Sequence, residues 1–157
     1  MSDPIVTLAD GGVTDLDGVM AVMDDSFDPR FGEAWTASQC ASLLPLPGVW
    51  LTLARAGEEI VGFALARAVA REAELLLLAV RRGRQRHGIG QRLLDAFTTI
   101  AIERGASRLY LEVREGNHAL VLYEHAGFTL AGRRRNYYCG ARGSTYDALT
   151  LAKVIHS

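Results

Sequence analysis

Gln85-Arg86-His87-Gly88-Ile89-Gly90 is the stretch of sequence from which the fold is most directly inferred. It follows the apolar residues 75–80, which are typical of a strand covered on both faces. It opens residues 88–104, whose apolar side chains recur on one face of a helix, and Gly105 stands where that helix would end. Glycines let the backbone approach a ligand closely, and the free N–H groups at a helix start attract anions. The turn therefore predicts a pyrophosphate site, unless its glycines only permit a tight strand-to-helix turn.

The charges around this turn favour the phosphate interpretation. Residues 81–92 contain five arginines and no acidic residue, whereas residues 1–33 contain eight acidic residues and one arginine. A concentrated positive field attracts phosphate-bearing ligands, and Arg84 or Arg86 can add charge-assisted hydrogen bonds. The motif is not a P-loop, because no Gly-Lys-Ser/Thr follows, and it lacks the three spaced glycines of a dinucleotide fingerprint.

The composition predicts one compact domain over residues 1–157. Apolar residues make up 49% of the chain and charged residues 22%, and the formal net charge is −1. These values exclude intrinsic disorder, and no apolar run approaches the roughly 18 residues of a membrane span. The first ten residues have neither the basic start nor the apolar stretch of a secretory signal. We therefore expect a cytoplasmic protein without membrane association.

Cysteine and histidine usage points to no metal or disulfide. The two cysteines, Cys40 and Cys139, cannot form a disulfide framework or a zinc site by themselves. His87, His118 and His125 do not have the spacing of metal ligands. No metal is expected.

Hydrophobic patterning divides the rest of the chain into further strands and helices. Alternating or continuous apolar stretches predict strands at residues 5–9, 50–54, 60–69, 108–113, 128–133 and 146–154. Helical spacing predicts helices at residues 15–25, 36–44 and 117–126, with Thr36 as an N-cap and Gly127 as a stop. The order of these elements indicates a mixed α/β sandwich of the α+β kind and not a repeating βαβ array.

Three blocks of sequence in register resemble the GNAT superfamily of acetyl-CoA-dependent N-acetyltransferases. That superfamily carries Gln/Arg-x-x-Gly-x-Gly/Ala at its strand-to-helix turn, which residues 85–90 match. Leu111-Glu112-Val113-Arg114 is similar to its next strand, and Leu122-Tyr123-Glu124-His125-Ala126-Gly127-Phe128 to the helix that follows. The resemblance covers residues 72–130. It implies a mixed, mostly antiparallel sheet of about six or seven strands with helices on both faces.

Within the superfamily, the chain is most similar to the RimI-type enzymes, which acetylate the N-terminal amine of a ribosomal protein. Four stretches support this likeness: Glu72-Ala73, Leu111-Glu112-Val113-Arg114, Arg134-Arg135-Asn136-Tyr137-Tyr138 and the early Ala34-Trp35-Thr36. The resemblance implies that the Arg134–Tyr138 stretch lies in a loop region facing the acceptor. The substrate-binding residues that it implies are Trp35, Arg135, Tyr137 and Tyr138.

The resemblance also implies acetyl-CoA as the co-substrate, bound where two central strands splay apart. Backbone groups of Leu78, Ala79 and Val80 would bind the pantetheine arm and the thioester, because the arm pairs there like an added strand. The other implied coenzyme-binding residues are Gln85, Arg86, His87, Gly88, Ile89, Gly90, Gln91 and Asn117.

Two side chains would transfer protons in such an enzyme. Glu112 would be the general base, acting through a water on an α-amine with a pKa near ~8. Tyr123 would be the general acid for the departing thiolate, since a phenol with a pKa near ~10 stays protonated at neutral pH. From the residues alone, Glu112 can also be a surface carboxylate or a partner of Arg114. Tyr123 can likewise be a core side chain that packs with Leu120 and Phe128.

One spacing departs from the superfamily pattern Asn-x-x-Ala-x-x-Leu-Tyr. Asn117 and Tyr123 are six positions apart, one fewer than in the pattern, and one residue is about 100° of helix rotation. We expect residues 114–117 to absorb the difference, with residues 119–123 kept in register by core packing. Asn117 is then either a coenzyme ligand or the N-cap of the helix.

The sequence therefore predicts an N-acetyltransferase that moves acetyl from acetyl-CoA directly onto a primary amine. The favoured acceptor is the N-terminal α-amine of a protein such as a ribosomal protein. A small amine (an aminoglycoside, a polyamine or an amino acid) is the alternative acceptor, and a CoA-binding module without turnover is the third hypothesis.

Cys139 has no His or Asp beside it to activate a thiolate, so no acyl-cysteine step is expected. Arginines 133–135 are expected to line an acidic substrate groove or face water and not to bind nucleic acid. Both monomer and dimer remain open.

Overall fold

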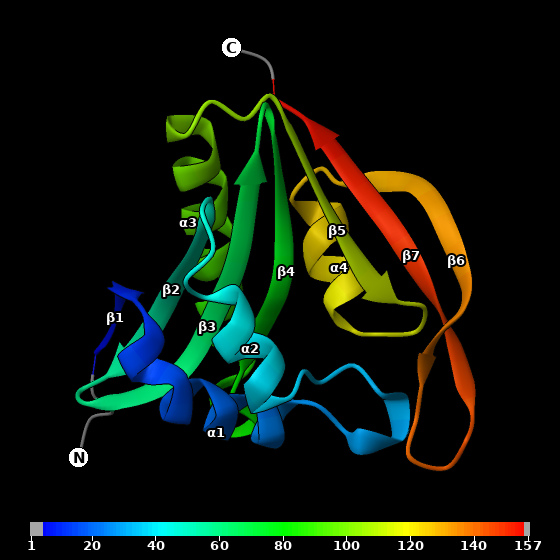
Figure 1. Ribbon diagram of the computed structural model, residues 1–157, viewed down its shortest axis with the longest axis horizontal. Coiled ribbons are helices and arrows are strands. Elements are labelled where there is room, and N and C mark those ends of the chain that lie inside the picture. Colours follow the sequence, from blue (N-terminus) through cyan, green and yellow to red (C-terminus); the bar gives the residue numbers. More distant parts are fainter. Residues whose placement is uncertain (1–4, 156–157) are drawn as a thin grey trace.

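A computed structural model describes residues 5–155 of the chain. Within these residues, four α-helices pack on a seven-stranded sheet (Figure 1). The strands are β1 (Val6–Gly11), β2 (Val49–Ala56), β3 (Glu59–Val69), β4 (Glu72–Val80), β5 (Arg108–Arg114), β6 (Thr129–Cys139) and β7 (Thr145–Val154). The helices are α1 (Leu16–Ser26), α2 (Ala37–Leu43), α3 (Ile89–Glu103) and α4 (Ala119–His125).

The sheet has the order β1-β2-β3-β4-β5-β7-β6, and only its central pair, β4 and β5, is parallel. On one face, Val22 and Met23 of α1 pack with Phe63 of β3. On the other face, where α3 and α4 lie, Phe97 packs with Leu111. The predicted mixed, mostly antiparallel sheet with helices on both faces is confirmed.

The central helix α3 starts and ends where its sequence predicts. Gly88, just before it, has the left-handed φ of 79°, and Gly105, just after it, has a φ of 91°. Its buried side chain Phe97 stacks on Trp50 of β2, with ring centroids 5.9 Å apart. Burying an aromatic side chain of this size contributes roughly 1.5–3 kcal/mol. This packing fixes the start of α3, and with it the glycine turn, against the sheet.

The last strands differ from the prediction. The strand predicted at residues 128–133 is β6 and continues to Cys139, so the Arg134–Tyr138 motif lies in a strand and not in a loop. Its pairing with β7 is irregular between Arg134 and Tyr138, where Asn136 has a φ of 53°. The Asn136 N–H donates to Asp147 Oδ1 at 2.9 Å. The sequence did not predict this extension of the strand, because its last residues are mostly exposed at the sheet edge and show no apolar alternation.

A short 3-10 helix, Pro29–Phe31, begins the segment that connects α1 to α2. This segment reaches the β6–β7 hairpin, where the Ala141 N–H donates to the Pro29 carbonyl at 3.1 Å. Gly32 is fitted tightly there, because a Cβ on it would lie 2.2 Å from the Cys139 carbonyl oxygen. Among residues 5–155, no helix combines the length and the apolar character that a membrane crossing needs.

Candidate active site

β4 and β5 pair over only four residues each and then diverge (Figure 1). The pairs run from Glu72 with Arg108 to Leu75 with Leu111. Beyond them, residues 76–80 of β4 and 112–114 of β5 line a cleft of about 980 Å³. Backbone groups that face this cleft lack a strand partner across it, and buried donors left unpaired are costly. The implied splay of two central strands is present, and Leu78, Ala79 and Val80 lie along its open edge.

The glycine turn closes one end of this cleft. Arg86 and Gly88 both have left-handed φ values, 66° and 79°. A Cβ added at Gly88 would meet no atom within 4 Å, so the backbone there is open to an approaching group. The first N–H groups of α3 lack partners within the helix, as in any helix. The turn residues that line the cleft are Arg84, Gln85, Arg86, Gly88, Gly90 and Gln91.

The remaining predicted turn ligands are placed differently. Within the described chain, His87 and Ile89 are not part of the cleft lining. The Ile89 side chain is buried in the core and the His87 side chain is exposed, so only their backbone N–H groups remain to face an anion. Gln85 has a structural contact as well, because its Nε2 donates to the Val80 carbonyl at 3.0 Å. That hydrogen bond ties the turn to the end of β4.

Tyr123 lies on α4, at the opposite wall of the cleft. Its side chain is 6% exposed, and its ring meets the Phe128 ring edge-on with centroids 6.2 Å apart. Burial raises the pKa of the Tyr123 phenol well above its ordinary value, and nearby Tyr138 and Glu33 raise it further. The phenol therefore stays neutral and is able to donate a proton or a hydrogen bond into the cleft.

Glu112 lies on β5 at the point where the two strands separate. Its carboxylate Oε1 is 2.8 Å from Arg134 Nε, and its side chain is 17% exposed. The alternative in which Glu112 is a partner of Arg114 does not hold, because Arg114 pairs with Glu33 instead. Glu112 thus faces the cleft as a carboxylate with a cationic neighbour from β6.

A second carboxylate, Glu74, lines the same part of the cleft and was missed from the sequence. It lies on β4 opposite Tyr110 of β5, two residues before Glu112 in that strand. Burial raises the pKa of Glu74, as does the nearby Glu112 carboxylate, while Arg134 and Arg67 lower it. The apolar run around Glu74 gave no signal of this contact, which depends on the parallel register of β4 and β5.

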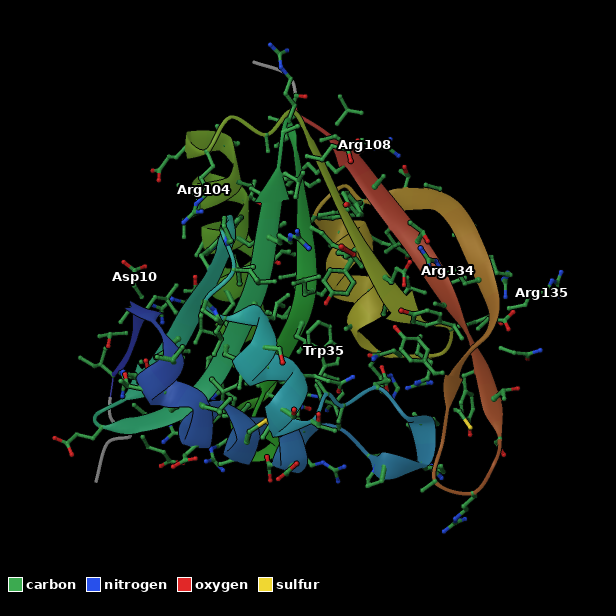
Figure 2. All side chains as sticks on the ribbon, viewed as in Figure 1. Asp10, Trp35, Arg104, Arg108, Arg134 and Arg135 are labelled. Carbon is green, nitrogen blue, oxygen red and sulfur yellow. The ribbon has the colours of Figure 1, made fainter. Side chains whose placement is uncertain are left out.

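The predicted acceptor residues divide into two groups. Trp35, Tyr137 and Tyr138 line the cleft, and the two tyrosine rings meet edge-on with centroids 5.0 Å apart. Arg135 is not among the lining residues of the described chain, whereas its neighbour Arg134 is. Figure 2 shows Arg135 at the outer margin of β6 and Trp35 near the middle of the molecule. Arg135 lies in the irregular stretch of β6 between Arg134 and Tyr138, and there Arg134 and not Arg135 reaches the cleft.

Asn117 precedes α4 and is held in place by both ends of its amide. Its Oδ1 accepts a hydrogen bond from Ala119 N–H at 2.8 Å, which caps the start of the helix. Its Nδ2 donates to Glu33 Oε2 at 2.6 Å. Asn117 lines the cleft, but these contacts fit the N-cap alternative more directly than a free coenzyme ligand.

Together, these residues define what the cleft can do. It can admit an extended chain along β4 and offers backbone N–H groups to an anion at the glycine turn, and Tyr123 and Glu112 line it as well. Such an arrangement can accept one proton and donate another during a group transfer between two bound molecules. Among residues 5–155, no group of three or more His, Cys, Asp or Glu side chains is arranged to hold a metal ion.

The fold and this cleft define a class of protein. Residues 16–128 match the acetyltransferase (GNAT) family, and the chain belongs to that family. Enzymes of the family use acetyl-CoA. The glycine turn and the open edge of β4 fit that co-substrate, since one offers N–H groups to a pyrophosphate and the other offers unpaired backbone to an amide-bearing arm.

The names of individual similar proteins are more specific than the description of the family. The chain is 41% identical over 101 residues to the [Ribosomal protein bS18]-alanine N-acetyltransferase of Salmonella typhimurium, covering 64% of this chain and 68% of that one. It is 38% identical over 94 residues to the Haemophilus influenzae protein of the same name, covering 60% of this chain and 64% of that one. The matched region therefore spans about two thirds of these relatives' length. The crystal structure of the ribosomal-protein-S18-alanine N-acetyltransferase from Escherichia coli superposes with a TM-score of 0.86 at 30% identity, covering 98% of this chain and 96% of that one.

Proposed function

We propose that this protein transfers the acetyl group of acetyl-CoA directly to the N-terminal α-amine of a protein, with a ribosomal protein as the favoured acceptor. The observation that supports this most is the divergence of β4 and β5, because the resulting cleft joins the glycine turn to Glu112 and Tyr123. The names of the relatives favour a protein N-terminus over a small amine. A cytoplasmic location, as predicted from the sequence, would bring the protein to such an acceptor.

Acetyl-CoA supplies the acetyl group as an activated thioester. In the proposed reaction, the backbone N–H groups of residues 86–91 hold the pyrophosphate at the positive end of α3. The open edge of residues 78–80 aligns the arm so that the thioester lies between the two proton-transferring side chains. Alignment of amine and thioester accounts for a large part of such a rate enhancement.

Glu112 removes a proton from the acceptor through a water. An α-amine with a pKa near ~8 is mostly protonated at neutral pH, and only the neutral amine attacks. Tyr123 donates to the departing sulfur on the other side of the reacting carbon. Its raised pKa keeps the proton on the phenol until negative charge develops next to it.

The acceptor end of the cleft combines apolar walls with negative charge, which suits an extended basic peptide. Trp35, Tyr137 and Tyr138 supply apolar walls. Glu74 and Glu112 supply negative charge on the floor of the sheet, and Arg134 pairs with Glu112. We propose that this combination favours a peptide whose first residues are small and whose following residues are basic.

The experiment that tests the function compares acceptors at saturating acetyl-CoA. Purified protein is mixed with a peptide that has N-terminal alanine followed by basic residues, and free thiol release is followed with time. The matched control is the same peptide with its α-amine already blocked, and mass spectrometry locates the added acetyl group. We expect thiol release with the free peptide only, and acetylation at its α-nitrogen.

Other outcomes would contradict the proposal in distinguishable ways. Release with a polyamine or an aminoglycoside but not with any free peptide would mean a small-molecule acceptor. Tight acetyl-CoA binding in calorimetry without release to any amine would mean a binding module.

A further inference from the structure

Glu33 is a buried carboxylate that the proposed reaction does not use. It lies in the segment that connects α1 to α2, just after the 3-10 helix Pro29–Phe31. Its side chain is 9% exposed, and that of its partner Arg114 is 10% exposed, with Arg114 Nε donating to Glu33 Oε1 at 2.9 Å. Buried ion pairs are costly unless every remaining group is also bonded. The second oxygen of Glu33 meets that condition, because it accepts from Asn117 Nδ2 at 2.6 Å.

Arg114 connects this carboxylate to the end of β5. It is two residues after Glu112 and therefore shares its side of the strand. Its guanidinium carbon lies 3.7 Å from the centroid of the Phe31 ring, and its Nη1 donates to the Glu115 carbonyl at 3.2 Å. The contacts with Glu33, Phe31 and Glu115 restrict rotation of the planar guanidinium. They therefore also restrict the end of β5, which bears Arg114.

Asn117 connects the same carboxylate to α4. Its Oδ1 binds the N–H of Ala119, the first residue of the helix that holds Tyr123. The loop from Arg114 to Asn117 is also where the one-residue difference from the superfamily pattern is expected to be absorbed. Glu33 therefore spans the two ends of the loop that has to absorb that change.

The segment around Glu33 is itself anchored on its other side. A Cβ on Gly32 would lie 2.2 Å from the Cys139 carbonyl oxygen, and Ala141 N–H donates to the Pro29 carbonyl at 3.1 Å. The carboxylate is thus presented from a segment that is also held against the β6–β7 hairpin.

We infer that Glu33 is a positioning residue, whose carboxylate sets Glu112 on β5 relative to Tyr123 on α4 by bonding Arg114 and Asn117 together. The inference rests on the proposed function for the roles of Glu112 and Tyr123. Under this inference, the α1–α2 segment contributes to the reaction by positioning Glu112 and Tyr123, in addition to forming a wall for the acceptor.

The test starts from Glu33→Gln, which keeps the size of the side chain and one acceptor oxygen but removes the charge that neutralises Arg114. We expect kcat with the peptide acceptor to fall about 10- to 100-fold, because small displacements of reacting groups are this costly. The calorimetric Kd for acetyl-CoA should stay within about twofold of wild type. The matched control is Glu103→Gln, the same substitution at an exposed position on the end of α3. Its kcat should equal that of the wild-type protein.

Arg114→Lys supplies a second variant in case Glu33→Gln folds poorly. It keeps the charge but replaces the planar group that bonds Glu33, so kcat should fall in the same direction with the melting temperature preserved. In the double variant, the two losses should be clearly less than additive, since both break one interaction. Additive losses would mean that Glu33 acts independently of Arg114 and would overturn the positioning role.

A readout without turnover separates this inference from the proposed function. The NMR resonances of the Tyr123 ring should move in Arg114→Lys, which leaves the Glu33 charge in place, and stay in place in Glu103→Gln. If folded Glu33→Gln shows wild-type kcat, or folded Arg114→Lys shows unmoved Tyr123 resonances, the positioning role is wrong and the proposed function stands. Absence of thiol release by the wild-type protein with every peptide would instead reject the function, while moved Tyr123 resonances would still support the placement of α4 by Glu33.

Discussion

The Tyr123 hydroxyl lies where burial disfavours charge, whereas Glu112 keeps an arginine beside it in the same cleft. In the proposed reaction, the neutral phenol donates a proton and the Glu112 carboxylate accepts one. At the scale of single residues, the chemistry of the site follows from this contrast.

Removing only the Tyr123 hydroxyl tests the donor role. Tyr123→Phe keeps the ring that packs against Phe128, so the melting temperature should change little. We expect kcat to fall by about 100-fold or more, while the Kd for acetyl-CoA stays close to the wild-type value. Single-turnover kinetics and calorimetry measure the two quantities. Equal losses in both would contradict an acid role.

The pH dependence of stability tests whether Asp147 holds the irregular part of β6 in place. A hydrogen bond from the Asn136 backbone lowers the pKa of Asp147, and Arg133 lowers it further. The charged form therefore stabilises the fold above the unfolded-state pKa of about 3.9, and this stabilisation is lost as pH falls through the lower folded-state pKa.

Urea unfolding should show this linkage directly. Asp147→Asn should be less stable than the wild-type protein at pH 7, and the difference should shrink as the pH falls below about 4. Asp10→Asn, at an exposed position far from the β6–β7 hairpin, is the control (Figure 2). A stability difference for Asp147→Asn that does not vary with pH would argue against this carboxylate as the anchor of Asn136.

The sequence could predict those site residues that lie in a short recognisable motif. Glu112 and Tyr123 stand in short stretches that resemble a family, and the structure places both in one cleft. Glu33 has no such stretch, and its partners are 81 and 84 positions away in the chain. Contacts of that kind depend on how segments meet in space, which periodicity and spacing do not encode.

The turn between β4 and α3 is the element on which coenzyme binding depends in the proposed function. Gly88 has a left-handed backbone with open space where a Cβ would lie. A side chain there brings backbone strain of about 1–2 kcal/mol and places a methyl group where a pyrophosphate has to approach. Gly57, in the turn between β2 and β3, has a similar φ of 64° and equally open surroundings.

These two glycines make a matched pair of variants. Gly88→Ala and Gly57→Ala should lose similar amounts of stability, since both impose the same kind of backbone strain. Only Gly88→Ala should weaken acetyl-CoA binding, by about tenfold or more, a loss of about 1.4 kcal/mol or greater. Calorimetry and thermal melting measure the two effects. The same loss of affinity in both variants would place the pyrophosphate elsewhere.

The open edge of β4 should respond to coenzyme along part of its length. Residues 72–75 already pair with β5, so their amide exchange should not change when acetyl-CoA is added. Amides of residues 76–80 that face the cleft should exchange more slowly, because the bound arm gives them partners. Hydrogen exchange followed by NMR distinguishes the two groups. Uniform slowing along β4 would indicate general stabilisation and not pairing at the open edge.

Element prediction worked where apolar periodicity was strong. α3 was expected at residues 88–104 and is Ile89–Glu103, because Leu93, Leu94 and Phe97 repeat at helical spacing and glycines flank the helix. β6 was predicted six residues too short at its end, because an exposed edge strand can consist of arginine, asparagine and tyrosine. Its extent is decided by pairing with β7, which the residues of β6 alone do not indicate.

The whole molecule consists of two parts of one sheet that meet at a short seam. β1 to β4 lie on one side and β5 to β7 on the other, and the parallel pairing between them involves four residues of each strand. The α1–α2 segment bridges the two parts a second time, through Glu33 and through its contact with the β6–β7 hairpin. Neither connection was predictable from periodicity, because both depend on the relative placement of elements distant in the chain.

The seam also makes the empty protein vulnerable to self-association. Unpaired strand edges are templates on which another chain can form a sheet, and the open edge of β4 begins with three consecutive leucines, residues 76–78. On warming, local opening would expose this edge first in molecules whose cleft is empty. Protein without coenzyme should therefore aggregate at a lower temperature than protein saturated with CoA, as light scattering can measure. Equal onset temperatures would mean that the edge is too recessed for a second molecule to reach.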